Sequence, residues 1–128
     1  MKIYLAASFA KIKDMVSIAE ILITKGHKIT SRWIYGGHDI ADSPFDKERF
    51  AREDIEDLKN SELCLSFTGT SLGRGGRHVE FGMAIASGIK CIIIGPRENV
   101  FHHLSDVKAF PNFESFLNFE PELSKERK

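Results

Sequence analysis

Short apolar runs alternate along this chain with segments of helical periodicity, and this alternation restricts the fold more than any other feature. Strands are expected at 2–7, 28–31, 62–67, 90–95 and 107–110, and helices at 12–26, 46–60, 77–87 and 112–119. Strand runs that are apolar on both faces are typical of parallel strands covered by helices on both sides. We therefore predict an α/β fold, namely a single flavodoxin-like doubly wound domain of about five parallel strands with helices on both faces.

The length and charge of the chain limit its organisation and its partners. At 128 residues it fits one domain, which we place at 1–119, followed by a charged tail at 120–128 that is expected to fray. Lys+Arg and Asp+Glu both number 18, so no net charge attracts DNA, RNA or anionic lipid. No apolar run approaches the ~18 residues of a membrane span, so we expect a cytoplasmic protein. The two cysteines, Cys64 and Cys91, are expected to be buried free thiols.

The loops that follow the expected strands lie where open α/β sheets bind their ligands. These loops span 7–11, 32–45, 68–76 and 96–103. Phe9 in the first loop and Trp33 in the second could stack on a base, although packing explains either ring equally well. Outside the third loop, the candidate substrate contacts are Ser8, Phe9, Trp33, Asn99 and His102.

A glycine-rich loop, Ser71 to Gly76, leads directly from an expected strand into an expected helix. Backbone N–H groups of such a loop can hold an anion or the polar edge of a ligand. The loop lacks the Lys-Ser/Thr ending of a P-loop and the glycine spacing of a dinucleotide site, which disfavours an NTPase or a dehydrogenase. A plain helix-entry turn is the alternative. The candidate ligand contacts here are Ser71, Gly73, Gly75, Gly76, Arg77 and His78.

Glu80 is the first candidate for chemistry. It falls in the first turn of the third expected helix, at the edge of a core face that we assign to Val79, Met83 and Ala86. The helix dipole favours its ionised form, and a carboxylate there could attack a carbon that bears a leaving group. The alternative is a glutamate that only stabilises its own helix.

Asp54 and Tyr4 are further candidates. Asp54 borders the buried stripe expected on the second helix, which we assign to Ala51, Ile55 and Leu58. An acid at the margin of a core needs partners, and two neighbouring carboxylates can divide their roles, one ionised and one protonated. Tyr4 lies in the first strand, where a buried hydroxyl needs a hydrogen bond. A solvated acidic helix face and a core tyrosine are the respective alternatives.

Several short motifs then occur in the order found in one enzyme family. They are Ile3-Tyr4-Leu5 through Phe9, Glu53-Asp54-Ile55-Glu56, Ser71-Leu72-Gly73, and Val79-Glu80-Phe81-Gly82 followed by 90–95. Over about residues 1–110 the chain resembles the nucleoside 2-deoxyribosyltransferase family, which includes 2′-deoxynucleoside 5′-monophosphate N-glycosidases. The resemblance implies a flavodoxin-like fold and a glutamate nucleophile that attacks the anomeric carbon, matching Glu80. It also implies that Tyr4 hydrogen-bonds the nucleophile, that Asp54 is the second acid, and that Ser71 contacts phosphate.

The chain departs from the transferase pattern in two places. Transferases of this family read the base with an acid shortly before the nucleophile, whereas 73–79 contains Arg74, Arg77 and His78 and no acid. They also borrow a C-terminal amide side chain from a neighbouring subunit, and 120–128 offers none. Arginines at a helix N-terminus oppose the dipole unless they bind an anion, so both departures favour a substrate with a phosphate.

We therefore predict an N-glycosidase that cleaves the base–sugar bond of a nucleoside 5′-monophosphate, of ribose or 2′-deoxyribose, through a covalent glycosyl-Glu80 intermediate. Base exchange between deoxynucleosides, and nucleotide binding without turnover, are the alternatives. The five histidines show no metal-ligand spacing, and neither a metal nor an organic cofactor is implied. In the monophosphate-hydrolysing relatives the segment corresponding to 96–103 reaches into a neighbouring subunit, so we expect a homodimer or a larger homo-oligomer.

Overall fold

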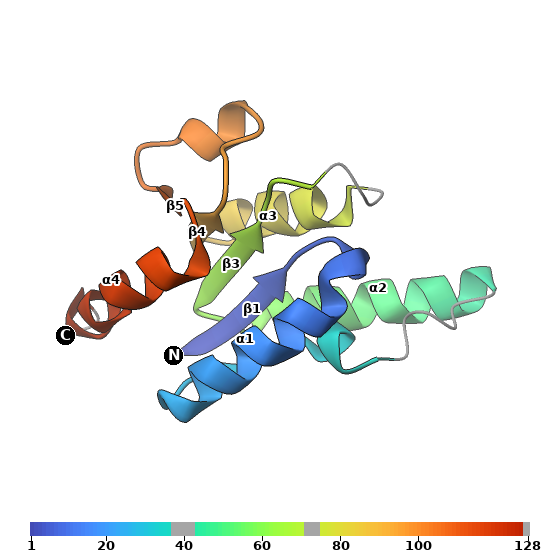
Figure 1. Ribbon diagram of the computed structural model, residues 1–128. Coiled ribbons are helices and arrows are strands. Elements are labelled where there is room, and N and C mark those ends of the chain that lie inside the picture. Colours follow the sequence, from blue (N-terminus) through green and yellow to red (C-terminus); the bar gives the residue numbers. More distant parts are fainter. Residues whose placement is uncertain (37–42, 71–74, 127–128) are drawn as a thin grey trace.

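The central element of the fold is a sheet of five parallel strands in the order β2-β1-β3-β4-β5 (Figure 1). The computed structural model describes residues 1–36, 43–70 and 75–126. The strands are β1 (Lys2–Ala6), β2 (Lys28–Ile29), β3 (Leu63–Phe67), β4 (Lys90–Ile94) and β5 (Lys108–Phe110). Each strand falls within its expected range, and the order confirms the predicted flavodoxin-like arrangement.

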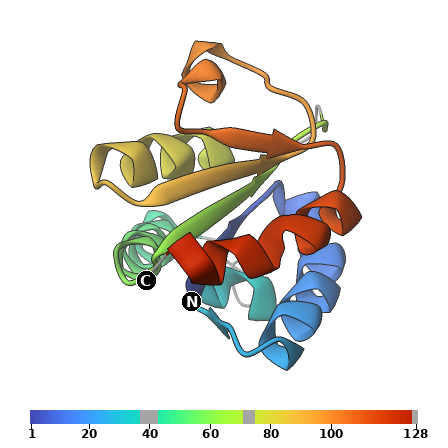
Figure 2. The same ribbon diagram turned by 90° about the vertical axis from the view of Figure 1, so that its left-hand side faces the viewer.

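Helices cover both faces of this sheet. Helices α1 (Ile12–Thr24) and α4 (Phe113–Glu126) lie on one side, and α2 (Pro44–Lys59) and α3 (Gly76–Ala86) lie on the other (Figure 2). All residues of β3 are buried, as expected for a strand packed on both faces. Short 3₁₀ helices follow three of the strands: η1 (Phe9–Lys11) after β1, η2 (Arg32–Tyr35) after β2 and η4 (Val100–His103) after β4.

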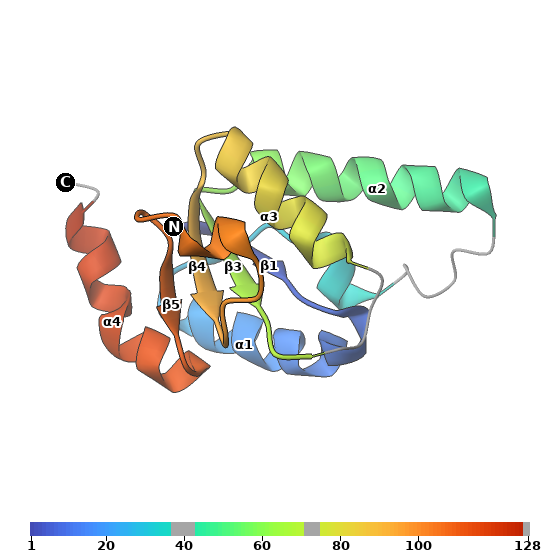
Figure 3. The same cartoon turned by 90° about the horizontal axis from the view of Figure 1, so that it is seen from above.

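Helix α2 starts at a capping serine and extends past the body of the protein. The Ser43 hydroxyl accepts the Asp46 N–H at 3.1 Å, and Pro44 takes the first helical position, where its missing N–H costs nothing. Leu58 is buried as predicted, whereas Ala51 is exposed. The first half of α2 projects beyond the start of α3 (Figure 3), which explains why the predicted apolar stripe holds only near the end of the helix.

The buried face of α3 differs from the predicted one. Val79 and Ala86 are exposed, whereas Arg77, Phe81 and Ala84 are the buried residues of this helix. The apolar pattern predicted the wrong buried side of α3 because the side that packs on the sheet includes an arginine, Arg77. Residues three or four positions apart share one side of a helix, and Glu80 is three positions after Arg77 and four before Ala84. The half-buried Glu80 therefore faces the sheet, whereas we expected it at the edge of the core face.

The expectation of a frayed tail from residue 120 is wrong, because α4 continues to Glu126. Glu120 is buried and lies 2.7 Å from His27 Nε2, and Leu123 is buried against the core. The charged composition of this segment led to the wrong expectation because its buried side consists of one paired acid, Glu120, and one leucine, Leu123.

Cys64 and Cys91 are buried free thiols, as predicted, and face each other across β3 and β4. Within residues 1–36, 43–70 and 75–126, the structure contains no helix long and apolar enough to cross a membrane.

Candidate active site

Tyr4 and Glu80 meet between the sheet and α3. Tyr4 is fully buried in β1, and its hydroxyl donates a hydrogen bond to Glu80 Oε2. The two residues lie 76 positions apart in the sequence, and the contact between α3 and β1 brings them together. The hydroxyl that needed a partner therefore has one, and that partner is the predicted nucleophile.

The surroundings of Glu80 disfavour its charged form. Burial raises the pKa of Glu80 from its usual value of 4.5 to about 8. The hydroxyl of Tyr4 is the hydrogen-bond donor that the structure gives to this carboxyl group. A carboxylic acid with a pKa near the operating pH can hold its proton at rest and become ionised at modest cost, which suits an acid–base or nucleophilic role.

Asp54 belongs to the same side of the sheet. It is half-buried on α2, and α2 packs against α3, the helix that carries Glu80. The predicted position at the margin of the core agrees with this placement.

Phe9 and Trp33 form an aromatic wall after β1 and β2. Their ring centroids are 6.4 Å apart, and the Trp33 indole N–H donates to Leu5 O at 2.8 Å. Trp33 is thereby fixed and buried, while Phe9 keeps 43% of its surface exposed. Ser8 is buried and accepts the Ala10 N–H at 3.4 Å, so its hydroxyl caps η1. Of these three candidates, Phe9 offers the open face.

The glycine-rich loop is described only where it enters α3. Gly75 has a φ of 89°, a left-handed conformation that favours glycine, and it caps the helix that Gly76 opens. The predicted contacts Ser71 and Gly73, together with Arg74, lie outside the described residues.

Arg77 is bound within the protein. It is 8% exposed, and its Nη1 donates to Glu98 Oε1 at 2.6 Å while Nη2 donates to Thr70 O at 3.0 Å. The other carboxylate oxygen of Glu98 accepts the Gly69 N–H at 3.2 Å. Desolvation opposes the charge of Glu98, but the bonds from Gly69 and Arg77 outweigh it and lower the pKa of Glu98.

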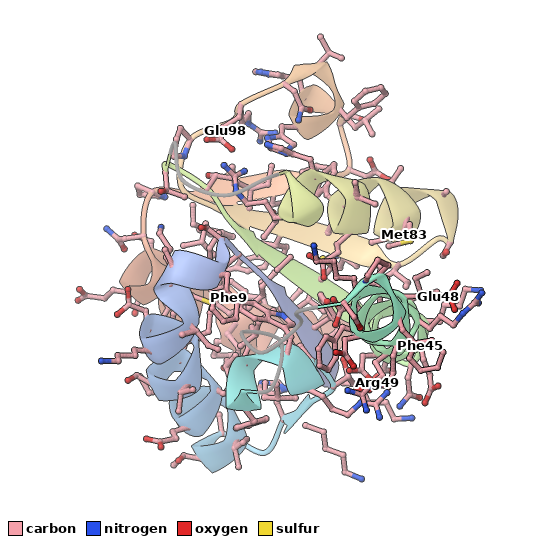
Figure 4. All side chains as sticks on the ribbon, turned by 90° about the vertical axis from the view of Figure 1, so that its right-hand side faces the viewer. Phe9, Phe45, Glu48, Arg49, Met83 and Glu98 are labelled. Carbon is pink, nitrogen blue, oxygen red and sulfur yellow. The ribbon has the colours of Figure 1, made fainter. Side chains whose placement is uncertain are left out.

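Sequence reasoning missed Glu98 as a member of the site. The signal that could have found it is an acid in the loop 96–103, at the same edge of the sheet as Arg77. Figure 4 views the molecule from the side toward which the arrows of β1 and β3 point in Figure 1, with Phe9 and Glu98 labelled on separate loops.

Asn99 and His102 hold the loop after β4 in shape. Asn99 Oδ1 accepts the Phe101 N–H at 3.0 Å, which caps η4. His102 is 0% exposed, its Nδ1 accepts the Glu98 N–H at 2.9 Å, and burial lowers its pKa. The His78 ring lies 5.7 Å from the His102 ring and is half-buried. Of these three predicted contacts, His78 and Asn99 are half-buried and His102 is buried.

No three His, Cys, Asp or Glu side chains in the described part of the chain come together as a metal site. A surface groove of about 480 Å³ lies elsewhere, between α1 and the start of α4. Its lining includes Lys11, Thr68, Pro96 and Phe113, so it borders the loops after β1, β3 and β4 but does not include Tyr4 or Glu80.

Comparison with known proteins places this fold beside two enzymes. Neither a protein-family model nor a curated protein matches the sequence. A 2-deoxyribosyltransferase from the psychrotolerant bacterium Bacillus psychrosaccharolyticus is 19% identical, with a TM-score of 0.76 over 92% of this chain and 91% of that one. A CMP N-glycosidase from Clostridium botulinum is 20% identical, with a TM-score of 0.64 over 94% of this chain and 98% of that one. At these identities the likeness establishes a shared fold.

Proposed function

We propose that the chain is an enzyme that breaks the N-glycosidic bond of a nucleoside or nucleoside 5′-monophosphate, with Glu80 as the covalent nucleophile. The observation that carries this proposal is the Tyr4–Glu80 pair, a half-buried carboxyl group bonded to a buried hydroxyl. The fold shared with a deoxyribosyltransferase and a CMP N-glycosidase supports the reaction class. The resemblance of the sequence motifs to the deoxyribosyltransferase family supports the role of Glu80.

The proposed reaction has two steps. In the first, an oxygen of the ionised Glu80 carboxylate bonds to the anomeric carbon, and the carbon–nitrogen bond breaks with its electron pair leaving on the base, which takes up a proton. In the second, water attacks the same carbon, loses a proton and releases the Glu80 carboxylate. Each step inverts the carbon, so the sugar product retains its configuration.

The surrounding residues have supporting roles in this proposal. The Tyr4 hydroxyl stabilises the ionised form of Glu80, and Asp54 orients the sugar and the nucleophile. The exposed face of Phe9, backed by Trp33, stacks on the base. His78, half-buried at the start of α3, lies at the same end of the site.

The phosphate prediction rested on Arg74, Arg77 and His78; Arg74 lies outside the described residues, and Arg77 is paired with Glu98. A substrate phosphate could reach Arg77 only by displacing that carboxylate. Both the nucleoside and its 5′-monophosphate are therefore substrates to test, in ribose and deoxyribose forms.

We also propose that the chain forms a homodimer or a larger homo-oligomer. Val79, Val100 and Phe101 are exposed apolar side chains on α3 and η4, and His78 and Asn99 bring these two elements into contact. Such a surface is typical of protein interfaces. Light scattering tests this, and a monomer at micromolar concentration would contradict it.

Base release is the direct test of the enzymatic proposal. A panel of nucleosides and 5′-monophosphates, with and without a second free base, is incubated with the protein and separated by chromatography. Free sugar or sugar phosphate indicates a hydrolase, and an exchanged nucleoside indicates a transferase. Ligand binding without release of base from any member of the panel would leave a binding protein and remove the enzymatic proposal.

A further inference from the structure

The carboxylate of Glu98 occupies a position built for an anion. One of its oxygens receives a guanidinium N–H of Arg77 at 2.6 Å, and the other receives the backbone N–H of Gly69 at 3.2 Å. His78 Nε2 lies 3.8 Å from Oε1. A guanidinium N–H combined with a backbone N–H from a separate loop is a donor pair that can bind a phosphate as well as a carboxylate.

This arrangement is fixed from several directions. The main-chain N–H of Glu98 donates to Nδ1 of the buried His102 at 2.9 Å. The preceding residue, Arg97, donates from its guanidinium to His102 O and, at 3.1 Å, to Val107 O. Arg77 is itself held by its second bond to Thr70 O. These bonds fix the backbone of the loop at Glu98, and its carboxylate, on a side chain that is 24% exposed, is held by Arg77 and Gly69.

The anion position lies next to the proposed nucleophile. Arg77 and Glu80 are three positions apart on α3, a spacing that places two side chains on one helix face with their Cβ atoms about 5–6 Å apart. Arg77 is buried and Glu80 is half-buried on that face. A sugar whose anomeric carbon meets Glu80 thus has the Arg77–Glu98 pair as a near neighbour.

We propose that Glu98 fills the place of a substrate phosphate with its own carboxylate and thereby selects nucleosides without a 5′-phosphate. A phosphate entering this position meets a carboxylate that is already bound to Arg77, so it is repelled rather than held. That the excluded phosphate belongs to a substrate rests on the proposed function. The anion position itself does not depend on catalysis.

Binding of inorganic phosphate tests the position directly. Glu98→Ala removes the charge and opens the space, Glu98→Gln removes the charge and keeps the space filled, and Glu98→Ala/Arg77→Met removes the guanidinium as well. Titration calorimetry on folded protein is expected to show phosphate binding by Glu98→Ala at least about tenfold tighter than by the wild type. Glu98→Gln is expected to gain less, and the double variant is expected to lose the gain. Glu48→Ala, which removes an exposed acid from α2, is the matched control and should resemble the wild type.

Equal phosphate binding by the wild type and Glu98→Ala, or a gain that survives Arg77→Met, would overturn the proposal. If Glu98→Ala does not fold, as judged by circular dichroism, Glu98→Ser takes its place because it is nearly as small and also removes the charge. Wild-type protein alone also decides: phosphate binding that Arg77→Met abolishes would show that Glu98 does not fill the position.

Substrate choice provides the second readout. The wild type is expected to use a nucleoside at least about tenfold better, by kcat/KM, than its 5′-monophosphate, and Glu98→Ala is expected to narrow that ratio by a similar factor. A wild type that prefers the monophosphate contradicts the inference while leaving the glycosidase proposal intact. Absence of base release from every substrate removes the glycosidase proposal, and the phosphate titration then still decides whether Glu98 fills an anion position.

Discussion

Two carboxyl groups lie near the start of α3, and their surroundings drive them toward opposite protonation states. Burial raises the pKa of Glu80 to about 8, and Tyr4 supplies its hydrogen bond. Desolvation acts on Glu98 as well, but the Gly69 N–H and the Arg77 guanidinium lower its pKa below the usual value. The comparison teaches that burial without a charged partner favours the protonated form of an acid in this region, whereas hydrogen bonds from a cation and a backbone N–H to a more open carboxylate favour the ionised form.

The same difference separates the proposed nucleophile, Glu80, from Glu98, which is held by the protein. Glu98 has its charge satisfied by protein donors and so has little to gain from a ligand. Within the described residues, Glu80 accepts its hydrogen bond from the neutral hydroxyl of Tyr4 rather than from a cation, so its ionised form is less stabilised than that of Glu98, which suits the proposed nucleophile. Four experiments would break or sharpen this contrast.

The largest expected effect is on base release by Glu80→Gln. The amide keeps the shape of the side chain but cannot form the glycosyl ester, so kcat should fall by at least about a thousandfold while the substrate still binds. Steady-state kinetics and calorimetric binding measure the two quantities. Glu98→Gln is the matched comparison, since it changes the neighbouring acid without removing the nucleophile. Activity of Glu80→Gln within tenfold of the wild type would remove Glu80 from the mechanism.

The second effect is on stability and has a defined pH window. The pKa of Glu80 is raised in the folded chain from 4.5 to about 8, so between these values the folded state holds a proton that the unfolded state has lost. The free energy of unfolding of the wild type should therefore fall as the pH rises through this window and level off above it. Glu80→Gln has no such group, so its stability relative to the wild type should increase by a few kcal/mol between about pH 5 and about pH 9. Urea unfolding at several pH values measures the difference, and parallel stability curves would contradict the raised pKa.

Glu98→Gln should act in the opposite direction. Removal of the carboxylate leaves the buried Arg77 guanidinium without its charged partner, which should cost about 2 kcal/mol near neutral pH. Because the folded pKa of Glu98 is lowered, the pair stabilises the wild type above the unfolded pKa, and this stabilisation is lost as the pH falls through the folded pKa. The difference in the free energy of unfolding between Glu98→Gln and the wild type should therefore disappear at acid pH. Glu48→Gln on the exposed face of α2 should stay within about 0.5 kcal/mol of the wild type, and an equal loss there would show that Glu98 has no special partner.

The sheet and the position of Glu80 at the start of a helix could be predicted because their signals are local. Alternating apolar runs and glycines mark the strands and turns, and the motif around Glu80 is continuous in the sequence. The pairing of Tyr4 with Glu80 followed from the family resemblance rather than from periodicity.

The parts that sequence reasoning missed depend on contacts between distant charges. Arg77 reaches Glu98 across 21 positions, and this pair turns a polar residue inward and shifts the buried face of α3. Glu120 reaches His27 across 93 positions, which holds a charged segment in α4. Hydrophobic periodicity cannot anticipate either pair, because each buries a charge whose partner is fixed only when the chain has folded.

The smallest expected effect comes from the hydroxyl of Tyr4. In the wild type, kcat/KM should rise with pH through about 8, since this profile reports the ionisation of Glu80 in the free enzyme. Tyr4→Phe removes a donor that favours the ionised carboxylate, so the rising limb should move to higher pH by about half a unit and the plateau should fall by about tenfold. Tyr35→Phe removes the same hydroxyl group from an exposed tyrosine in η2, and the pH profile of kcat/KM should then match that of the wild type. A Tyr4→Phe limb at the wild-type position, with activity lost only in proportion to unfolded protein, would make the hydroxyl a packing group and leave Glu80 ionised by other means.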